Sequence, residues 1–200
     1  RRAGIGLVYL NDIDAAIDSA ETALAQLTPE HNRWFAKRSG LAPEVICCCY
    51  LSEAWWMRGF PDKGRNFIER AIAVATATQH QPSQEFAVGY QAEFYQLLRD
   101  HDRVLAATVA SFHLGEVHGS AFWNQMITAY KGWALSAQGR HNEGIALMRD
   151  GLARYRAAGN ALIAAGALMP AIGGTATKAG YVEVLYVLEF VGLILIWAGD

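Results

Sequence analysis

The stretch at residues 120–138 reads SAFWNQMITAYKGWALSAQ and decides the fold class of this chain. Its large apolar residues recur at steps of three and four, which is the period of an α-helix with one broad apolar face. These residues are Phe122, Trp123, Met126, Ile127, Tyr130, Trp133 and Leu135. The spacing predicts an amphipathic helix that packs one face against its neighbours.

The same period appears on both sides of this stretch, at residues 67–75 and 145–155. No segment sustains the apolar/polar alternation of a β-strand, and the turn dipeptide Asn-Gly is absent. Proline is scarce, with 5 in 200 residues, and alanine is abundant, which favours helix. The sequence therefore predicts an all-α fold.

The composition excludes two classes of protein. Of the residues, 52% are hydrophobic and 18% are charged, and the formal net charge is −2. A chain of this kind lacks the basic surface of a nucleic-acid-binding protein, so we expect no nucleic-acid partner. It also holds enough apolar surface to offset the entropy of folding, which excludes intrinsic disorder.

Short breaks between the helices recur at a fixed interval. Tight turns fall at Gly59, near Asp100, at Gly139 and at Gly180, with spacings of 41, 39 and 41 residues. A weaker first turn near Asn11 lies 48 residues before Gly59, and we assign the excess to a loop at residues 28–42. Looser breaks are expected at residues 80–83, 118–120 and 159–160. This order predicts an α-solenoid of four to five antiparallel helical hairpins that forms one domain over residues 1–200.

Small residues follow the tight turns at a matching offset. Ala16, Gly64 and Gly144 each lie five positions after a turn residue. A small side chain at this place lets the two helices of a hairpin approach closely. The pattern, in which small and large residues alternate across the hairpin interface, is typical of tetratricopeptide-like repeats.

Five sequence runs carry a resemblance to a known family: residues 40–45 (GLAPEV), 54–62 (AWWMRGFPD), 131–135 (KGWAL), 138–145 (QGRHNEGI) and 148–156 (MRDGLARYR). Over roughly residues 30–190 the chain resembles the tetratricopeptide-type (TPR) helical region at the C-terminal end of bacterial multidomain signalling proteins. Those proteins resemble class III adenylate/guanylate cyclases or regulators fused to a STAND-type ATPase. The residues of a cyclase or ATPase site are not in this chain, so we expect no catalytic residue and a fragment of a longer protein.

The resemblance implies a protein-interaction or regulatory module located in the cytoplasm. A protein, a peptide or a neighbouring domain would dock in the concave groove lined by the first helix of each hairpin. Aromatic residues predicted on these helices are the candidate contacts, since such side chains anchor many interfaces. They are Trp55, Trp56, Tyr90, Phe94, Tyr95, Trp123, Tyr130 and Trp133. The alternatives are a free-standing TPR adaptor and, from another class, an all-α enzyme with an active site in a groove.

No metal or cofactor site is expected from the sequence. The adjacent thiols of Cys47, Cys48 and Cys49 lack the spacing of a zinc or redox site, so we assign them to a helix-packing seam. His113, Glu116 and His118 do not share one helix face, which argues against a metal centre. The glycines at residues 4–6 and 173–174 complete no phosphate-binding motif.

Residues 181–198, YVEVLYVLEFVGLILIWA, are the one candidate for a membrane segment. The run is about as long as the ~20 residues that a spanning helix needs. Glu183 and Glu189 lie inside it, and each carboxylate would cost roughly 2–3 kcal/mol near the bilayer centre. We therefore expect a last helix whose apolar face belongs against a neighbouring repeat that is missing from this chain, rather than against lipid.

Overall fold

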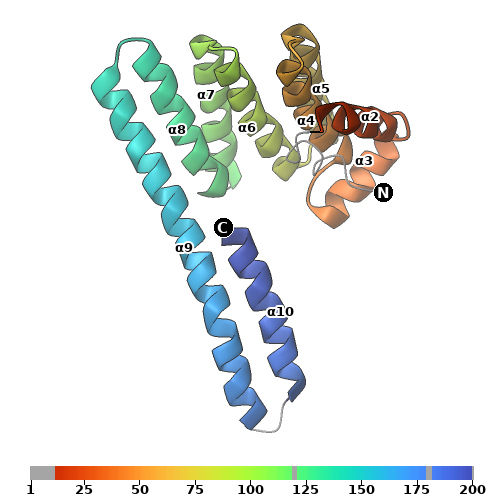
Figure 1. The fold of residues 1–200 in the computed structure, drawn as a ribbon. Helices are drawn as coiled ribbons and strands as arrows, with labels where there is room; N and C mark the ends of the chain where they lie inside the picture. The colour runs from red at the N-terminus through yellow and green to blue at the C-terminus, as the bar shows by residue number, and fades with distance from the viewer. Residues whose placement is uncertain (1–11, 119–120, 179–181, 200) are drawn as a thin grey trace. The chain divides into compact units, whose positions relative to one another are not determined.

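The computed structural model describes residues 12–118, 121–178 and 182–199, and it places all their side chains except those of 116–118, 121–124, 171–178, 182, 196 and 199. These residues form helices and no strand, which confirms the all-α prediction for this part of the chain (Figure 1). The helices are α2 (Ile13–Leu24), α3 (Pro29–Ser39), α4 (Pro43–Met57), α5 (Pro61–Thr78), α6 (Gln81–Leu97), α7 (His101–His118), α8 (Ala121–Ala137), α9 (His141–Lys178) and α10 (Val182–Gly199).

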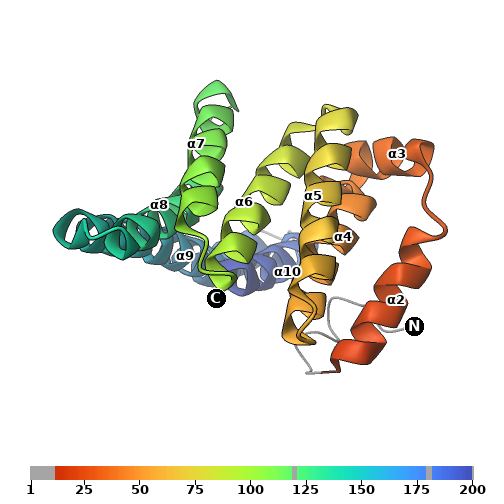
Figure 2. The same ribbon diagram turned by 90° about the horizontal axis from the view of Figure 1, so that it is seen from above.

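The chain divides into two compact units, residues 1–148 and residues 149–200, and the boundary falls inside α9. In the first unit each helix from α4 to α8 packs on the next, and α4, α6 and α8 also contact one another in succession. Seen from above, α4, α5, α6 and α7 lie side by side (Figure 2). This division reflects where the chain packs most densely on itself. That residues 1–200 form a single repeat domain stays a prediction.

Three of the expected tight turns are confirmed, and they share one geometry. Gly59, Arg99 and Gly139, each 40 residues apart, adopt the left-handed conformation with φ of +81°, +58° and +90°. The following residue donates its N–H to the carbonyl five positions back, in the pairs Phe60–Trp55, Asp100–Tyr95 and Arg140–Leu135. This bond closes a helix C-terminus. The turns expected near Asn11 and at Gly180 lie outside the described residues.

The close approach predicted at Gly64 and Gly144 is confirmed. A Cβ on Gly64 would lie 2.5 Å from the carbonyl oxygen of Ser52, so α4 and α5 touch backbone to backbone there. Gly144 meets the carbonyl oxygen of Gly132 in the same way where α8 meets α9. Both members of the second contact lie 80 residues after those of the first, so the same crossing recurs two hairpins later. Ala16, at the corresponding place of the first copy, is buried.

A continuous core runs through the first unit from α3 to α8. Its fully or nearly fully buried members include Ala36, Val45, Cys48, Cys49, Ile68, Ala71, Ala87, Phe94, Val104 and Ala134. Small residues alternate with large ones in this set, which lets neighbouring helices pack at short range. Cys48 and Cys49 are thus core residues of a helix seam, as the sequence predicts.

The loop expected at residues 28–42 is wrong, because most of this segment is helix α3. Thr28 accepts a hydrogen bond from the N–H of His31, Pro29 occupies the first turn and Gly40 ends the helix at φ +85°. These are the ordinary start and stop signals of a helix. The extra length before Gly59 is therefore an added helix, and it explains the 48-residue spacing.

A polar network that starts from buried Asn32 holds α3 on the next two helices. Asn32, which is buried, accepts the N–H of Glu44 at 3.0 Å and donates its amide to the Glu44 carboxylate at 2.5 Å. Arg70 of α5 donates to the other carboxylate oxygen from Nε at 2.9 Å and from Nη2 at 2.5 Å. Glu44 thus links three helices through its two oxygens.

The break expected at residues 159–160 is also wrong, because α9 continues through Gly159 and Asn160. A glycine inside a helix costs only about 1 kcal/mol relative to alanine, and alanines flank this pair. The break expected at residues 80–83 lies instead at residues 79–80, since α5 ends at Thr78 and α6 begins at Gln81, so residues 81–83 are helical. The one at residues 118–120 extends beyond the described residues.

The second unit is a helix pair made by the last part of α9 and by α10. Gly192 of α10 lies against Gly166 of α9, and a Cβ on Gly192 would come within 2.6 Å of the Gly166 carbonyl oxygen. Much of α10 that faces away from this contact is apolar and exposed. Within the described residues, no helix meets the length and hydrophobicity required to cross a membrane.

Candidate functional site

Aromatic side chains gather where α4, α6 and α8 lie next to one another. On α6, Phe86, Tyr90 and Glu93 follow at helical spacing and share one face. The ring of Tyr90 packs against Phe86 with centroids 4.6 Å apart, and edge-on against Tyr50 of α4 at 5.5 Å. These are favourable aromatic geometries that hold the two helices together while leaving the rings half-exposed.

Three tyrosines occupy equivalent positions on the three helices. Tyr50, Tyr90 and Tyr130 are spaced by 40 residues, and all three are half-buried. We call the surface made by Tyr50, Glu53, Phe86, Tyr90, Glu93 and Tyr130 the tyrosine face. Because tyrosine recurs at the same register, the face exposes the same type of side chain on three neighbouring helices, α4, α6 and α8.

Two carboxyl groups lie within the tyrosine face. Glu53 is one turn after Tyr50, and Glu93 is one turn after Tyr90. Burial and the neighbouring charge of Glu93 raise the pKa of Glu53 to about 8. Burial also raises the pKa of Glu93, while the hydroxyl of Tyr130, which donates a hydrogen bond to it, lowers that pKa. The face can therefore hold a proton on Glu53 at neutral pH.

Tyr130 completes this cluster from α8. Burial and the charges of Glu93 and Glu53 raise the pKa of its phenol. The phenol thus stays protonated and remains a hydrogen-bond donor. Cys49 of α4 is near this cluster. Burial is the largest cause that raises the pKa of its thiol, followed by the charges of Cys48, Glu53 and Glu93.

Of the aromatic residues expected to line a groove, the structure brings Tyr90 and Tyr130 to the tyrosine face. The side chain of Trp123 lies outside the described residues. Sequence reasoning missed Tyr50, Glu53 and Glu93. The 40-residue spacing of the tyrosines was the signal that could have found Tyr50, and the same offset relates the two glutamates.

Trp55 lies elsewhere, next to the turn between α4 and α5. Its ring packs edge-on against Phe60 at 5.7 Å, and Nζ of Lys63 lies 3.9 Å from the ring centroid. It also covers the small core cluster of Ile17 and Leu51 where α2 meets α4. Trp55 therefore covers a part of the core near the N-terminal helices of the first unit, away from the tyrosine face.

The remaining aromatic candidates belong to the core. Phe94 is fully buried and Tyr95 nearly so, and Phe94 fills the space over Gly64. Trp56 and Trp133 pack partly buried against the main core cluster. Neighbouring positions on a helix point about 100° apart, so an adjacent pair cannot serve one surface.

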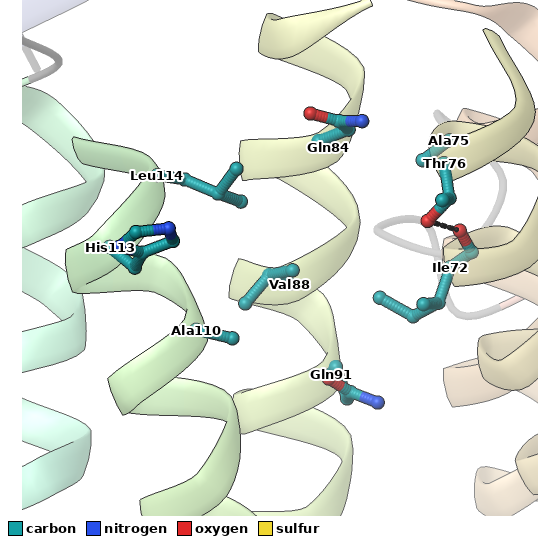
Figure 3. A pocket seen from close by; sticks show the side chains of 9 residues that line it. All are labelled: Ile72, Ala75, Thr76, Gln84, Val88, Gln91, Ala110, His113 and Leu114. Atoms are coloured by element: carbon teal, nitrogen blue, oxygen red, sulfur yellow. Dashed lines mark hydrogen bonds between the residues drawn. The ribbon is translucent and has the colours of Figure 1, made fainter. Parts of the chain in front are cut away.

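A cavity lies between α5, α6 and α7 (Figure 3). By helical spacing, the α6 residues that line it point away from the tyrosine face. It has a volume of about 320 Å³, with α6 as its floor and α5 and α7 as its walls. The lining residues are Ile72, Ala75, Thr76, Gln84, Val88, Gln91, Ala110, His113 and Leu114. The hydroxyl of Thr76 is used within α5, where it donates to the carbonyl of Ile72 at 2.8 Å.

A second cavity of about 360 Å³ shares Gln91 with the first and continues along the same side of α6. Arg103 of α7 lines it and donates to the Tyr95 hydroxyl at 2.8 Å, and Glu69 of α5 lines it as well. The two cavities form an α5–α7 groove. The groove and the tyrosine face therefore use opposite faces of one helix.

Among the side chains that the structure places, no group of three histidine, cysteine or acidic residues is arranged to hold a metal ion. His113 lines the α5–α7 groove, whereas the side chains of Glu116 and His118 are outside the described set. Comparison with known proteins found no family model that matches the chain, and no curated protein matches it significantly.

Proposed function

We propose that residues 12–148 form a tetratricopeptide-like helical-repeat module whose function is to bind a protein or peptide partner without catalysis. Support comes from the recurrence of one turn geometry at Gly59, Arg99 and Gly139 and of one helix crossing at Gly64 and Gly144. Repeated units of about 40 residues that stack on their neighbours make an extended surface, and such surfaces commonly bind partners.

The observation that carries the proposal is the row of Tyr50, Tyr90 and Tyr130 at the same register of α4, α6 and α8. Tyrosine offers a large contact area with few rotatable bonds and a polar tip, so it anchors partners at low entropic cost. A helical-repeat protein needs only a hydrophobic core at these positions, which leucine would fill as well. Tyrosines that keep part of their surface exposed at three equivalent positions are better explained by contact with a partner.

Glu53 and Glu93 add a preference to this surface. A basic side chain of the partner that enters between the two carboxyl groups would favour their charged forms and thus lower the pKa of Glu53. Its ammonium or guanidinium group would also stack favourably on the neighbouring rings. The preferred partner is therefore a segment with apolar or aromatic residues and at least one Lys or Arg.

In a signalling protein of the kind that the sequence resembles, the free energy of this contact would bias an attached effector domain between two states. The partner is then a separate protein or a neighbouring domain of the same chain. A free-standing adaptor in the cytoplasm would use the same face without an effector. The coding sequence on either side of this chain distinguishes the two, since only the first includes a cyclase, ATPase or DNA-binding domain.

The experiment is a selection from a random peptide library against the 200-residue chain, followed by affinity measurement for the enriched peptides. We expect peptides with aromatic and basic residues, and at least a tenfold weaker affinity for Tyr90→Ala. Trp34→Ala, which removes an exposed aromatic on α3, is the matched control and should leave the affinity unchanged. Peptides that bind Tyr90→Ala as well as the parent chain would contradict the proposal.

An enzyme remains the second candidate, and the specific observation in its favour is the position of Glu53 beside Glu93, where burial and the charge of Glu93 raise the pKa of Glu53 to about 8. Paired carboxyl groups of unequal pKa are typical of acid–base catalysis. A screen of hydrolase substrates decides this point. The enzyme predicts turnover that Glu53→Gln and Glu93→Gln each abolish, whereas the binding module predicts no turnover in the parent chain.

A further inference from the structure

Helix α10 of the second unit exposes a continuous apolar stripe. Tyr186 and Phe190 are each 67% exposed, Leu193 is 66% exposed and Trp197 is 82% exposed. Val187 and Ile194 border the stripe and are exposed too. Isolated apolar residues are normal on a protein surface, but a contiguous patch of large ones marks an interaction site.

The stripe lies on the side of α10 that faces away from α9. Gly192, which is buried against Gly166 and Met169, marks the side that packs within the unit. At 100° per residue, Phe190 points about 160° away from Gly192. The pairing of α9 with α10 therefore leaves the stripe uncovered.

The spacing of the residues in the stripe indicates that a helix covers it. Tyr186, Phe190, Leu193 and Trp197 follow at steps of four, three and four, the alternation of the core positions in a coiled coil. Such a row packs along a second helix with the same periodicity. The chain itself carries such a helix, namely α10 of a second copy.

The area available fits a dimer. The three aromatic side chains expose roughly 100–200 Å² each, and with the three aliphatic ones the stripe offers roughly 700 Å². A standard protein interface buries about 800 Å² on each partner. Pairing two copies through this one stripe therefore reaches the lower part of the range for stable complexes.

The charges on α10 favour one orientation of the two paired helices. Glu183 and Glu189 are both exposed. A parallel pair places each glutamate beside its own copy, and like charges at such positions repel. An antiparallel pair separates them along the axis and places the positive N-terminal end of each helix dipole beside the negative C-terminal end of the other.

We propose that the chain forms a homodimer through antiparallel packing of α10 against α10 of a second copy, with Phe190 on Leu193 and Tyr186 on Trp197 across the interface. This inference does not depend on the proposed function of the first unit. It assigns the apolar residues of the C-terminal segment to self-association.

The first test is the mass of the 200-residue chain in solution by light scattering coupled to size exclusion, and by sedimentation. We expect a dimer at about 10 µM and a dissociation constant raised at least about 100-fold by Phe190→Glu. Trp34→Glu, at an exposed aromatic on α3, is the control and should leave the dimer intact. Circular dichroism of both variants verifies that the helices persist.

A monomer at about 50 µM would overturn the proposal, since a built interface of this size binds at micromolar concentration or tighter. Monomers that float with vesicles of phosphatidylcholine and phosphatidylglycerol would overturn it as well and assign the stripe to a lipid surface. A dimer that Phe190→Glu leaves intact would show that another surface makes it.

Disulfide formation tests the orientation. Phe190→Cys mixed with Leu193→Cys should cross-link under mild oxidation, because the antiparallel arrangement brings these two positions together. Neither variant alone should cross-link comparably, and the parent chain, with Cys47, Cys48 and Cys49 only, is the blank. Efficient cross-linking of Phe190→Cys alone would indicate a parallel pair and overturn the proposed arrangement.

Discussion

The hydroxyl of Tyr130 in α8 donates a hydrogen bond to the carboxylate of Glu93 in α6. The bond spans two helices that belong to successive hairpins, and it supplies a donor to a carboxyl group that burial makes costly to ionise. We expect Tyr130→Phe to lower the free energy of unfolding by about 1–2 kcal/mol, because Glu93 loses its partner. Urea unfolding at pH 7 measures this. An unfolding free energy that Tyr130→Phe leaves unchanged would contradict the assignment.

Glu53 predicts how stability depends on pH. Its pKa of about 8 lies above the ~4.3 of an unfolded chain, so in between the folded state holds a proton that the unfolded state has lost. Stability from this group is fully present below about pH 4 and falls as the pH rises toward 8. Glu53→Gln removes this dependence, and we expect it to stabilise the chain at pH 8 by about 1–2 kcal/mol.

Urea unfolding at pH 5, 6.5 and 8 gives the comparison for Glu53→Gln. The parent chain should lose stability across this range, and the variant should lose less of it. Glu69→Gln, at an exposed position on α5, changes the net charge equally and should leave the slope as in the parent. A variant whose slope matches the parent's would show that Glu53 is charged in the folded chain.

The contact of Gly64 with Ser52 predicts that adding one methyl group at position 64 greatly lowers the stability of the fold. An added Cβ would lie 2.5 Å from the Ser52 carbonyl oxygen and 2.8 Å from the Phe94 ring, so α4 and α5 must separate. We expect Gly64→Ala to destabilise the chain by about 2–4 kcal/mol, although alanine is the better helix former. Gly59→Ala, where open space surrounds the left-handed glycine, should cost only about 1 kcal/mol. Thermal unfolding of both variants orders them.

The repeat could be recognised from sequence because its determinants are local. Left-handed glycines and the small residues that follow them are dictated by a turn and by a helix crossing within one hairpin. Gly59, Gly139, Gly64 and Gly144 were found in this way. The middle turn has Arg99 where the other two have glycine, so its position could be predicted only from the polar residues around Asp100.

The candidate site was less accessible, because it depends on how helices far apart in sequence face one another. Phe94 and Tyr90 lie on the same helix and have similar side chains, yet one fills the core and the other lies on the tyrosine face. Glu53 and Glu93 resemble solvated charges until α4 and α6 are placed side by side. The helix at residues 29–39 was missed because a regular 40-residue period left no place for it.

Arg99 holds a conformation that glycine occupies at Gly59 and Gly139. Its φ of +58° is unfavourable for a residue with a Cβ by about 1 kcal/mol. We therefore expect Arg99→Gly to stabilise the chain, by no more than about 0.5 kcal/mol after the greater entropy of the unfolded glycine is subtracted. Thermal unfolding measures the change. Arg33→Gly, inside α3, should instead destabilise it by about 1 kcal/mol.

Cys48 and Cys49 should be inert toward thiol reagents in the folded chain. Both are fully buried, and burial raises the pKa of Cys48 to about 12 and that of Cys49 well above its usual range. Since the thiolate is the reactive form, a disulfide reagent at pH 8 should label these two only after denaturation. Half-buried Cys47, whose pKa burial also raises, should react slowly in the folded state. Rapid labelling of two or three thiols per chain would show that α4 is not packed in the core as described. The positions of Tyr50 and Glu53, which also lie on α4, would then be wrong as well.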